Sequence, residues 1–261
     1  MLEIKDLTIQ YGDKPPVVEN FSLSLKKGEI ITIVGESGSG KSTVLSSILG
    51  LLPNGGKIIS GDIIYNGESM LNKSLNQWRE LRGTEITMIS QDSGGTLNPI
   101  RKIGKQFVEY IQTHSKMSTK EAEEKAKDMF SKVNLPDPEI IMKSYPHQLS
   151  GGMKQRVGIA MALTFHPKII LADEPTSALD VITQAQIVKE IMDLRKKFDT
   201  SIIMVTHNLG VAAYISDKII VMQNGKIVDA GNKNEVIENP KSEYTKKLLE
   251  AVPEIGGERL V

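Results

Sequence analysis

The sequence predicts an α/β protein with a mixed sheet, an antiparallel β subdomain and an inserted α-helical subdomain. Apolar, β-branched runs typical of buried strands occur in both halves of the chain, and helical patterns follow them. Strands with alternating polar and apolar residues surround the first of these runs. Residues 92–163 separate the two parts and carry helical patterns with little strand signal.

Composition limits the possible functions. The 261 residues are 39% hydrophobic, which suffices for a core in one large domain or two small ones. Lys+Arg and Asp+Glu balance at 32 each, so the charge does not indicate a nucleic-acid or acidic-lipid surface. The lack of cysteine excludes disulfides, thiolate zinc sites and iron–sulfur clusters, and it suits a reducing compartment. Without a signal-peptide pattern or an apolar run of about 20 residues, we expect the chain alone to be soluble and cytoplasmic.

Strands dominate the first part of the chain. Alternation predicts half-buried strands over Leu2–Tyr11 and Phe21–Leu25, and the apolar run Glu29–Val34 predicts a buried one. Further strands are expected over Ile63–Gly67 and over Ile86–Ser90, which delivers Gln91 at its carboxyl end. This part should mix antiparallel strands with a parallel core.

Helices are expected in the middle of the chain. Ser118 and Glu121 have capping-box spacing, and an apolar stripe follows them until Pro136-Asp137-Pro138 ends the helix. The stripe consists of Ala122, Ala126, Met129, Phe130 and Val133. A last helix should begin at Ser150 and end before Pro167.

The α/β pattern then resumes. Strands are predicted over Lys168–Asp173 and Ser201–Thr206, with a helix between them whose core face contains Ile187 and Ile191. Asn224-Gly225 between two apolar runs predicts a two-residue hairpin. A short helix-prone tail follows from Tyr244 to Ala251.

The motif G-x-x-x-x-G-K-[ST] forms a glycine loop between a predicted strand and a predicted helix. In this setting backbone N–H groups and the helix start bind phosphate, the lysine reaches the β- and γ-phosphates, and the first hydroxyl binds Mg²⁺. The alternative is a Gly/Ser-rich turn before an ordinary helix. We predict a nucleoside triphosphate site containing Gly35, Glu36, Ser37, Gly38, Ser39, Gly40, Lys41, Ser42 and Thr43.

Polar residues follow other predicted strands. Asp173 ends an apolar strand, where a carboxylate can hold Mg²⁺, and Glu174 beside it can polarise the attacking water. Without the glycine loop, this pair would be interpreted as an acidic helix cap. Gln91 and His207 also follow strands, whose carboxyl ends line the ligand crevice of a parallel sheet. Gln91 could ligate Mg²⁺ or position water, and His207 could hydrogen-bond the γ-phosphate.

A second anion cradle is predicted at Ser150, Gly151 and Gly152, where a hydroxyl, exposed N–H groups and a helix dipole point the same way. One nucleotide site does not need two cradles. An economical interpretation is that this one faces a nucleotide held by another subunit. The alternative is a flexible helix cap.

Taken together, these residues resemble the ATP-binding subunit of an ABC (ATP-binding cassette) transporter over nearly the whole chain. Gly35–Thr43 matches the Walker A motif, Ile169–Glu174 the Walker B motif with its catalytic glutamate, and Leu149–Met153 the LSGGQ-type signature with Met153 where Gln is commonest. The other matches are the Q-loop residue Gln91, the D-loop Ser177-Ala178-Leu179-Asp180, the switch residue His207, and Tyr11, where the family stacks an aromatic ring on adenine. The resemblance implies a P-loop NTPase core in an ABC ATPase cassette that uses ATP and Mg²⁺. It also implies catalytic roles for Glu174, His207 and Gln91.

Finer features resemble the peptide/nickel importer subfamily. They are Gln91-Asp92 with Leu97-Asn98-Pro99, Tyr145-Pro146-His147-Gln148, and the tail residues Tyr244-Thr245, Leu248-Leu249 and Ala251-Val252-Pro253. Ser242-Glu243 stands where the family often has His-Pro, and no cysteine-bearing extension follows Pro253. A nickel or metal-chelate importer therefore fits at least as well as a peptide importer.

The resemblance implies a peripheral protein at the cytoplasmic face of the inner membrane. Its expected partners are a second ATPase subunit, identical or paralogous, two transmembrane permease subunits and, indirectly, an extracytoplasmic solute-binding protein, but no nucleic acid. A single domain is expected, with residues 1–91 and 164–235 as the core and β subdomain, 92–163 as the helical subdomain and 236–261 as the tail. One alternative is a non-transport ABC ATPase of the DNA repair or translation type, which would show coiled-coil insertions or tandem cassettes. Another is a non-catalytic regulator, which the presence of Glu174 and His207 argues against.

Overall fold

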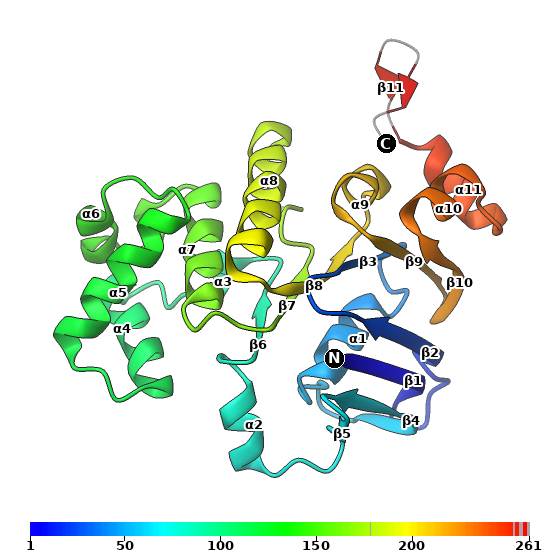
Figure 1. The fold of residues 1–261 in the computed structure, drawn as a ribbon, viewed down its shortest axis with the longest axis horizontal. Helices are drawn as coiled ribbons and strands as arrows, with labels where there is room; N and C mark the ends of the chain where they lie inside the picture. Colours follow the sequence, from blue (N-terminus) through cyan, green and yellow to red (C-terminus); the bar gives the residue numbers. More distant parts are fainter. Residues whose placement is uncertain (178, 253, 256–257, 260–261) are drawn as a thin grey trace. The chain divides into compact units, whose positions relative to one another are not determined.

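The computed structural model describes residues 1–177, 179–252, 254–255 and 258–259 (Figure 1). Ala178 of the expected D-loop and Pro253 of the expected tail motif lie outside the described residues. The described chain divides into two compact units. Unit 1 comprises Met1–Trp78 with Ser201–Val261, and unit 2 comprises Arg79–Thr200.

An antiparallel sheet in unit 1 has the strand order β2-β1-β4-β5. The predicted strands β1 (Leu2–Tyr11) and β2 (Val18–Leu25) are confirmed, while β4 (Gly56–Tyr65) is longer than expected and the short β5 (Glu68–Ser69) was not predicted. The alternation in β1 is interrupted at Asp6, whose φ of 47° accompanies a register shift against β2. The Asp6 N–H donates to the Ser22 hydroxyl, which in turn donates to the Asp6 carboxylate, so polar contacts hold this bulge.

The second sheet of unit 1 contains the order β10-β9-β3-β8. Its central strand β3 (Ile30–Val34) pairs in parallel with β8 (Ser201–Thr206) and β9 (Lys218–Gln223), and every residue of β3 and β8 is buried. β9 and β10 (Lys226–Asn232) form the predicted hairpin. Asn224 and Gly225 have φ values of 48° and 80°, as a two-residue turn of this kind requires. Antiparallel and parallel pairs are therefore combined in one mixed sheet, as expected.

Several helices accompany these strands. They are α1 (Lys41–Ile48), α9 (Leu209–Ile215), α10 (Lys233–Glu238) and α11 (Glu243–Glu250). The tail helix α11 confirms the prediction for Tyr244 to Ala251 within a residue or two. The strands β11 (Glu254–Ile255) and β12 (Glu258–Arg259) follow it as a small antiparallel pair. Helix α2 (Leu75–Leu81) was not predicted, and Trp78 is its one buried residue.

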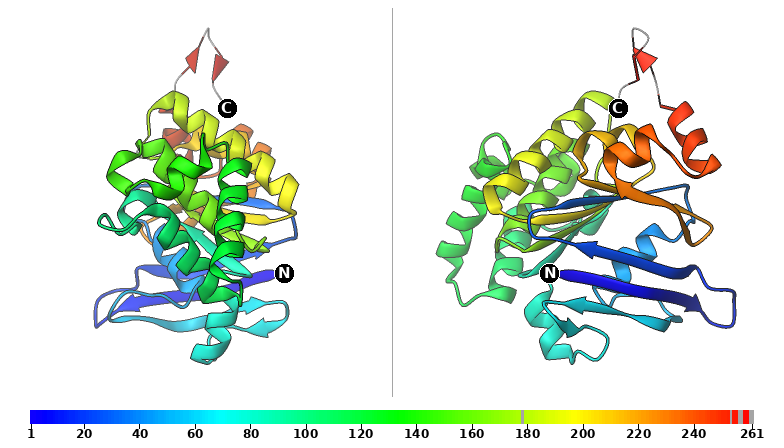
Figure 2. Two further views of the ribbon diagram at one scale, coloured as in Figure 1. Left: turned by 90° about the vertical axis from the view of Figure 1, so that its left-hand side faces the viewer. Right: turned by 45° about the vertical axis from the view of Figure 1, so that its right-hand side comes forward.

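Unit 2 contains the expected run of helices, gathered together in the left view of Figure 2. They are α3 (Ser93–Thr96), α4 (Ile103–His114), α5 (Thr119–Lys132), α6 (Pro138–Lys143), the 3-10 helix η1 (Pro146–Gln148), α7 (Gly151–Leu163) and α8 (Val181–Phe198). The predicted capping box of α5 is present, and its predicted stripe is buried. Strands β6 (Ile86–Ile89) and β7 (Ile169–Asp173) pair in parallel.

Within the described ranges, no helix has both the length and the apolar character that a membrane span requires.

Candidate functional site

The glycine loop of unit 1 leaves the buried strand β3 and enters α1, the arrangement that the motif requires. A Cβ atom at Gly35 would lie 2.2 Å from the Met222 carbonyl oxygen. At Gly40, where φ is 96°, a Cβ would lie 2.8 Å from the Val17 carbonyl oxygen. Only glycine fits these two positions, because the neighbouring backbone occupies the space that a side chain needs.

Lys41 is folded into this loop. Its side chain is 5% exposed, and Nζ donates to the carbonyl oxygens of Gly35 at 2.8 Å and Glu36 at 2.7 Å. The N-cap residue of α1 is Gly40, which has no side-chain oxygen to accept from the first-turn N–H groups. An anion can take that place, because the positive end of the helix dipole and these N–H groups point toward it. The loop thus combines a positive side chain with a helix start, as the phosphate-site prediction requires.

His207 leaves the sheet at the same edge as the glycine loop. In the parallel pair of β3 and β8, Val34 lies opposite Thr206, so the next residues, Gly35 and His207, emerge side by side. The His207 side chain is exposed there. The strand pairing thus places His207 beside the loop. Its contact with a γ-phosphate stays a prediction.

Tyr11, the predicted adenine-stacking residue, ends β1 and is half-buried. Gly56 of the neighbouring strand β4 approaches its ring so closely that a Cβ there would lie 2.7 Å from Tyr11 Cε1. The strand pairing fixes the ring's position at the end of the antiparallel sheet. Its stacking on a base stays a prediction.

The acidic pair and Gln91 emerge together in unit 2. Ile89 of β6 lies opposite Ala172 of β7, so the residues after these positions leave the same end of two paired parallel strands. Asp173 and Glu174 are half-buried and Gln91 is exposed. Within this unit, the parallel pairing thus brings the three residues to one edge of the sheet, and their catalytic and metal-binding roles stay predictions.

Glu174 has an unusual backbone. Its φ is 43°, a left-handed conformation that typically costs a non-glycine residue about 1–3 kcal/mol. The N–H and hydroxyl groups of Ser177 both donate to the Glu174 carbonyl oxygen at 3.2 Å. The residue of the expected D-loop therefore stabilises the turn that carries the expected catalytic carboxylate. Strain of this kind is common where a side chain must be aimed for function.

The predicted second cradle lies at the start of α7. The Ser150 hydroxyl accepts from the Met153 N–H at 3.3 Å, so this serine does cap the helix, and its residue remains exposed. A Cβ at Gly151 would lie 3.5 Å from Leu179, and one at Gly152 would lie 3.0 Å from Thr183. A Cβ at Gly151 would therefore make an ordinary contact, whereas the lack of a side chain at Gly152 lets the start of α8 approach the signature residues closely.

Asp180, predicted to bind the cofactor, caps α8. Its carboxylate accepts from the Thr183 N–H at 3.0 Å and from the Thr183 hydroxyl at 2.7 Å. These hydrogen bonds lower the pKa of Asp180 below its ordinary value. A nucleotide contact for this residue stays a prediction.

Arg156 of the signature helix forms an ion pair that the sequence does not predict. Its guanidinium donates to both carboxylate oxygens of Glu190, with Nη2 2.8 Å from Oε1 and Nε 3.1 Å from Oε2. Both side chains are largely buried, and the pair fixes the signature helix α7 against α8. Sequence patterns give no signal for a pair that is 34 residues apart.

The fold, together with the glycine loop of unit 1 and the acidic pair of unit 2, defines an ATP-binding cassette ATPase. The family model described as ABC transporter matches residues 18–177, more than half of the chain. The chain therefore belongs to the ABC transporter family.

Similar proteins carry transport names. The oligopeptide transport ATP-binding protein OppD of Bacillus subtilis is 44% identical over 97% of this chain and 72% of its own length. The metal-staphylopine import system ATP-binding protein CntD of Staphylococcus aureus is 42% identical over 95% of this chain and 92% of its own. These names favour a transport ATPase over the non-transport alternative.

Solved structures support the same cassette fold. The dimeric, post-hydrolysis ATP-binding cassette MJ0796 bound to ADP and Pi is similar with a TM-score of 0.78 and 29% identity, over 89% of this chain and 99% of that one. CbiO1 from Clostridium perfringens, part of the ABC transporter complex cbiONQ, is similar with a TM-score of 0.79 and 27% sequence identity. The match covers 91% of this chain and 90% of cbiO1.

Proposed function

We propose that this chain is the ATP-hydrolysing subunit of an importer that takes up peptides or nickel and other metal chelates through separate membrane subunits. The observation that carries the proposal is the glycine loop with Lys41 inside it and His207 at the same sheet edge. The names of the relatives, oligopeptide transport and metal-staphylopine import, support the two substrate classes.

The residues have distinct proposed roles. The loop Gly35–Thr43 binds the triphosphate and Tyr11 stacks on adenine. Glu174 polarises the attacking water, and His207 and Gln91 contact the γ-phosphate and the water.

The donors also fit Mg²⁺. Ser42, Gln91 and Asp173 offer hydroxyl, amide and carboxylate oxygens, which are the ligands this hard cation prefers. In the described part of the chain, no cluster of three or more His, Cys, Asp or Glu side chains could hold a metal alone. Mg²⁺ at nucleotide sites usually takes one or two protein ligands with phosphate oxygens and water, so this sparse set is appropriate. When bound, the ion would neutralise charge on the β- and γ-phosphates.

The proposed assembly contains two ATPase subunits, two transmembrane permease subunits and an extracytoplasmic solute-binding protein. The cassette would then lie at the cytoplasmic face of the membrane. Two similar solved structures support such an arrangement. MJ0796 is a dimeric cassette, and cbiO1 is part of the ABC transporter complex cbiONQ. Ser150, Gly151 and Gly152, with Asp180 close by, would face the nucleotide of the partner subunit.

Nucleotide binding by the purified chain tests the core of the proposal. Wild type should bind ATP, and Lys41→Ala should bind it about 10- to 100-fold more weakly because a charge-assisted hydrogen bond is lost. The matched control is Lys5→Ala, which removes an exposed lysine that forms an ion pair with Glu3. Equal affinity of wild type and Lys41→Ala would contradict the proposed site.

The solute class needs a separate test. Purification of the assembled transporter should recover permease subunits together with this chain. Uptake by the reconstituted complex should then be measured with short peptides and with nickel chelates. Failure of both classes to enter would refute the proposed substrates while leaving the ATPase proposal intact.

A further inference from the structure

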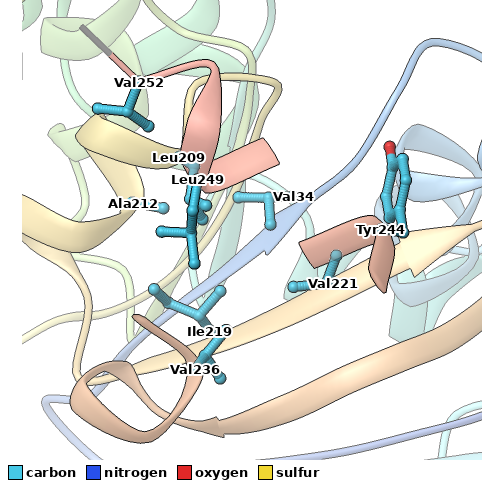
Figure 3. Packing of buried hydrophobic residues seen from close by; sticks show 9 residues of the cluster. All are labelled: Val34, Leu209, Ala212, Ile219, Val221, Val236, Tyr244, Leu249 and Val252. Carbon is cyan, nitrogen blue, oxygen red and sulfur yellow. The ribbon is translucent and has the colours of Figure 1, made fainter. Parts of the chain in front are cut away.

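The tail helix α11 packs into the core of unit 1 (Figure 3). Tyr244 and Leu249 of this helix, with Val252 after it, belong to a buried cluster with residues of β3, β9, α9 and α10. Val34, the last residue of β3 before the glycine loop, is in the same cluster. The tail therefore packs in the same buried cluster as the residue that precedes the glycine loop.

The Tyr244 hydroxyl contacts the loop itself. It accepts a hydrogen bond of 2.9 Å from the Glu36 N–H. This N–H belongs to the peptide between Gly35 and Glu36, and the carbonyl of the same peptide accepts from Lys41 Nζ at 2.8 Å. The peptide plane is therefore held on both sides, by the tail on one and by the phosphate-site lysine on the other.

The position of Tyr244 is well defined. The carboxylate of Asp229, a residue of β10 that is 5% exposed, accepts from the Lys241 N–H at 2.8 Å and from the Ser242 N–H at 3.4 Å. The Ser242 hydroxyl then accepts from the Tyr244 N–H at 3.1 Å and caps α11. Tyr244 is only 8% exposed, so it is held by both hydrogen bonds and packing.

We propose that Tyr244 is a positioning residue for the phosphate loop, and that its hydroxyl fixes the Gly35–Glu36 peptide so that the loop is organised before the triphosphate binds. The inference rests on the proposed function of the loop. A preorganised site binds more tightly because less freedom is lost on binding. The hydroxyl does not need to touch the nucleotide for this effect.

The test compares full-length wild type with Tyr244→Phe, which keeps the ring in the core. Affinity for the fluorescent analogue TNP-ATP should fall about 2- to 10-fold, the range for one ordinary hydrogen bond. KM for ATP should rise by a similar factor while kcat at saturation stays nearly unchanged. The melting temperature is measured in parallel, since a general loss of packing would lower kcat and stability together.

Two controls isolate the hydroxyl. Thr245→Val removes the next hydroxyl in the same helix, a buried one with no hydrogen-bond partner in the described structure. Tyr214→Phe makes the same chemical change at a residue that is 60% exposed. Both variants should bind TNP-ATP like wild type. Equal weakening by either control would overturn the proposal.

Amide hydrogen exchange gives a second readout, and its measurement on wild type does not depend on any variant folding well. In wild type without nucleotide, the Glu36 amide should be protected, and in Tyr244→Phe it should exchange faster while amides of β3 keep their rates. An unprotected Glu36 amide in wild type, or unchanged TNP-ATP affinity in Tyr244→Phe, would overturn the inference. If wild type itself failed to bind TNP-ATP and ATP, the proposed function would fail instead.

Discussion

Glu174 is the residue on which the proposed hydrolysis depends. Glu174→Gln should retain MgATP binding but lose turnover by about 10²–10⁴-fold, because the amide keeps the shape of the side chain and cannot act as a base. Steady-state ATP hydrolysis and equilibrium binding of the same preparation measure the two effects. The exposed Glu123→Gln is a suitable control. Turnover like that of wild type in the Glu174 variant would remove this residue from its role.

His114 provides a pH-dependent prediction in unit 2. Burial lowers its pKa below the ordinary 6.5, and its ring packs 5.1 Å from that of Tyr110 and 5.7 Å from that of Phe165. Above pH 6.5 the residue is neutral in both the folded and the unfolded chain. As pH falls below 6.5, the unfolded chain takes up the proton first, so the free energy of unfolding should decrease until the lowered pKa is passed.

Urea unfolding at pH 7.5 and 5.5 checks this sign. His114→Phe keeps the aromatic packing and should reduce the loss of stability on acidification. His166 should supply part of the remainder, since burial and the charges of Lys125 and Lys132 lower its pKa. An identical pH dependence in wild type and variant would show that His114 does not contribute.

Residue-level prediction from sequence succeeds where the chemistry is local. The glycine loop and the acidic pair can each be recognised from a few consecutive residues. His207 can be placed because it follows a strand that the apolar pattern predicts. Tyr244 was noted only as a tail marker, because its partner Glu36 is 208 residues away in sequence. No local pattern specifies such a contact.

At the scale of elements, the segment after Gln91 has a defined structure. Asp92 caps α3 by accepting from the Gly95 N–H at 2.8 Å. Gln106 of α4 holds the following turn, with its amide nitrogen donating to the carbonyls of Asn98 and Arg101. Ile100 in this turn is 82% exposed, although it is a large apolar residue. The exposed Ile100 side chain is therefore available for contact with another subunit.

We predict that this turn docks onto the membrane subunits. Ile100→Ser should lower transport by the reconstituted complex while sparing the basal ATPase activity of the isolated chain. Arg101→Ala, which loses an ion pair with Glu109, should act in the same direction. The control Ile59→Ser changes an apolar residue of unit 1 that is 51% exposed. Normal assembly and transport in the Ile100 and Arg101 variants would exclude this docking surface.

Element prediction was uneven for physical reasons. Strands β3, β7 and β8 are continuous apolar runs, and α5 has both a capping box and a stripe, so all four were predicted. Helix α4 was placed only within a helical region, although Ile103, Phe107 and Ile111 already show its buried face. Helix α2 buries only Trp78, so it has no stripe to detect.

At the scale of the whole molecule, the sequence motifs identified the family because they are short and in a fixed order. The two units could not be anticipated in the same way, since their composition depends on contacts between distant segments. The expected subdomain boundaries at residues 92 and 163 therefore remain predictions. The two proposed anion cradles, at the starts of α1 and α7, are the reason to expect a site shared between two subunits.

The most direct test of the account is a complementation measurement on dimers formed from two differently tagged copies of this chain. One copy carries Lys41→Ala and the other Ser150→Ala, and MgATP-dependent closure is compared with that of dimers in which a single copy carries both lesions. If each site uses Lys41 of one subunit and Ser150 of the other, the first arrangement keeps one intact site and should still close. The second arrangement spoils both sites and should not. Equal closure in the two arrangements would contradict the shared-site account.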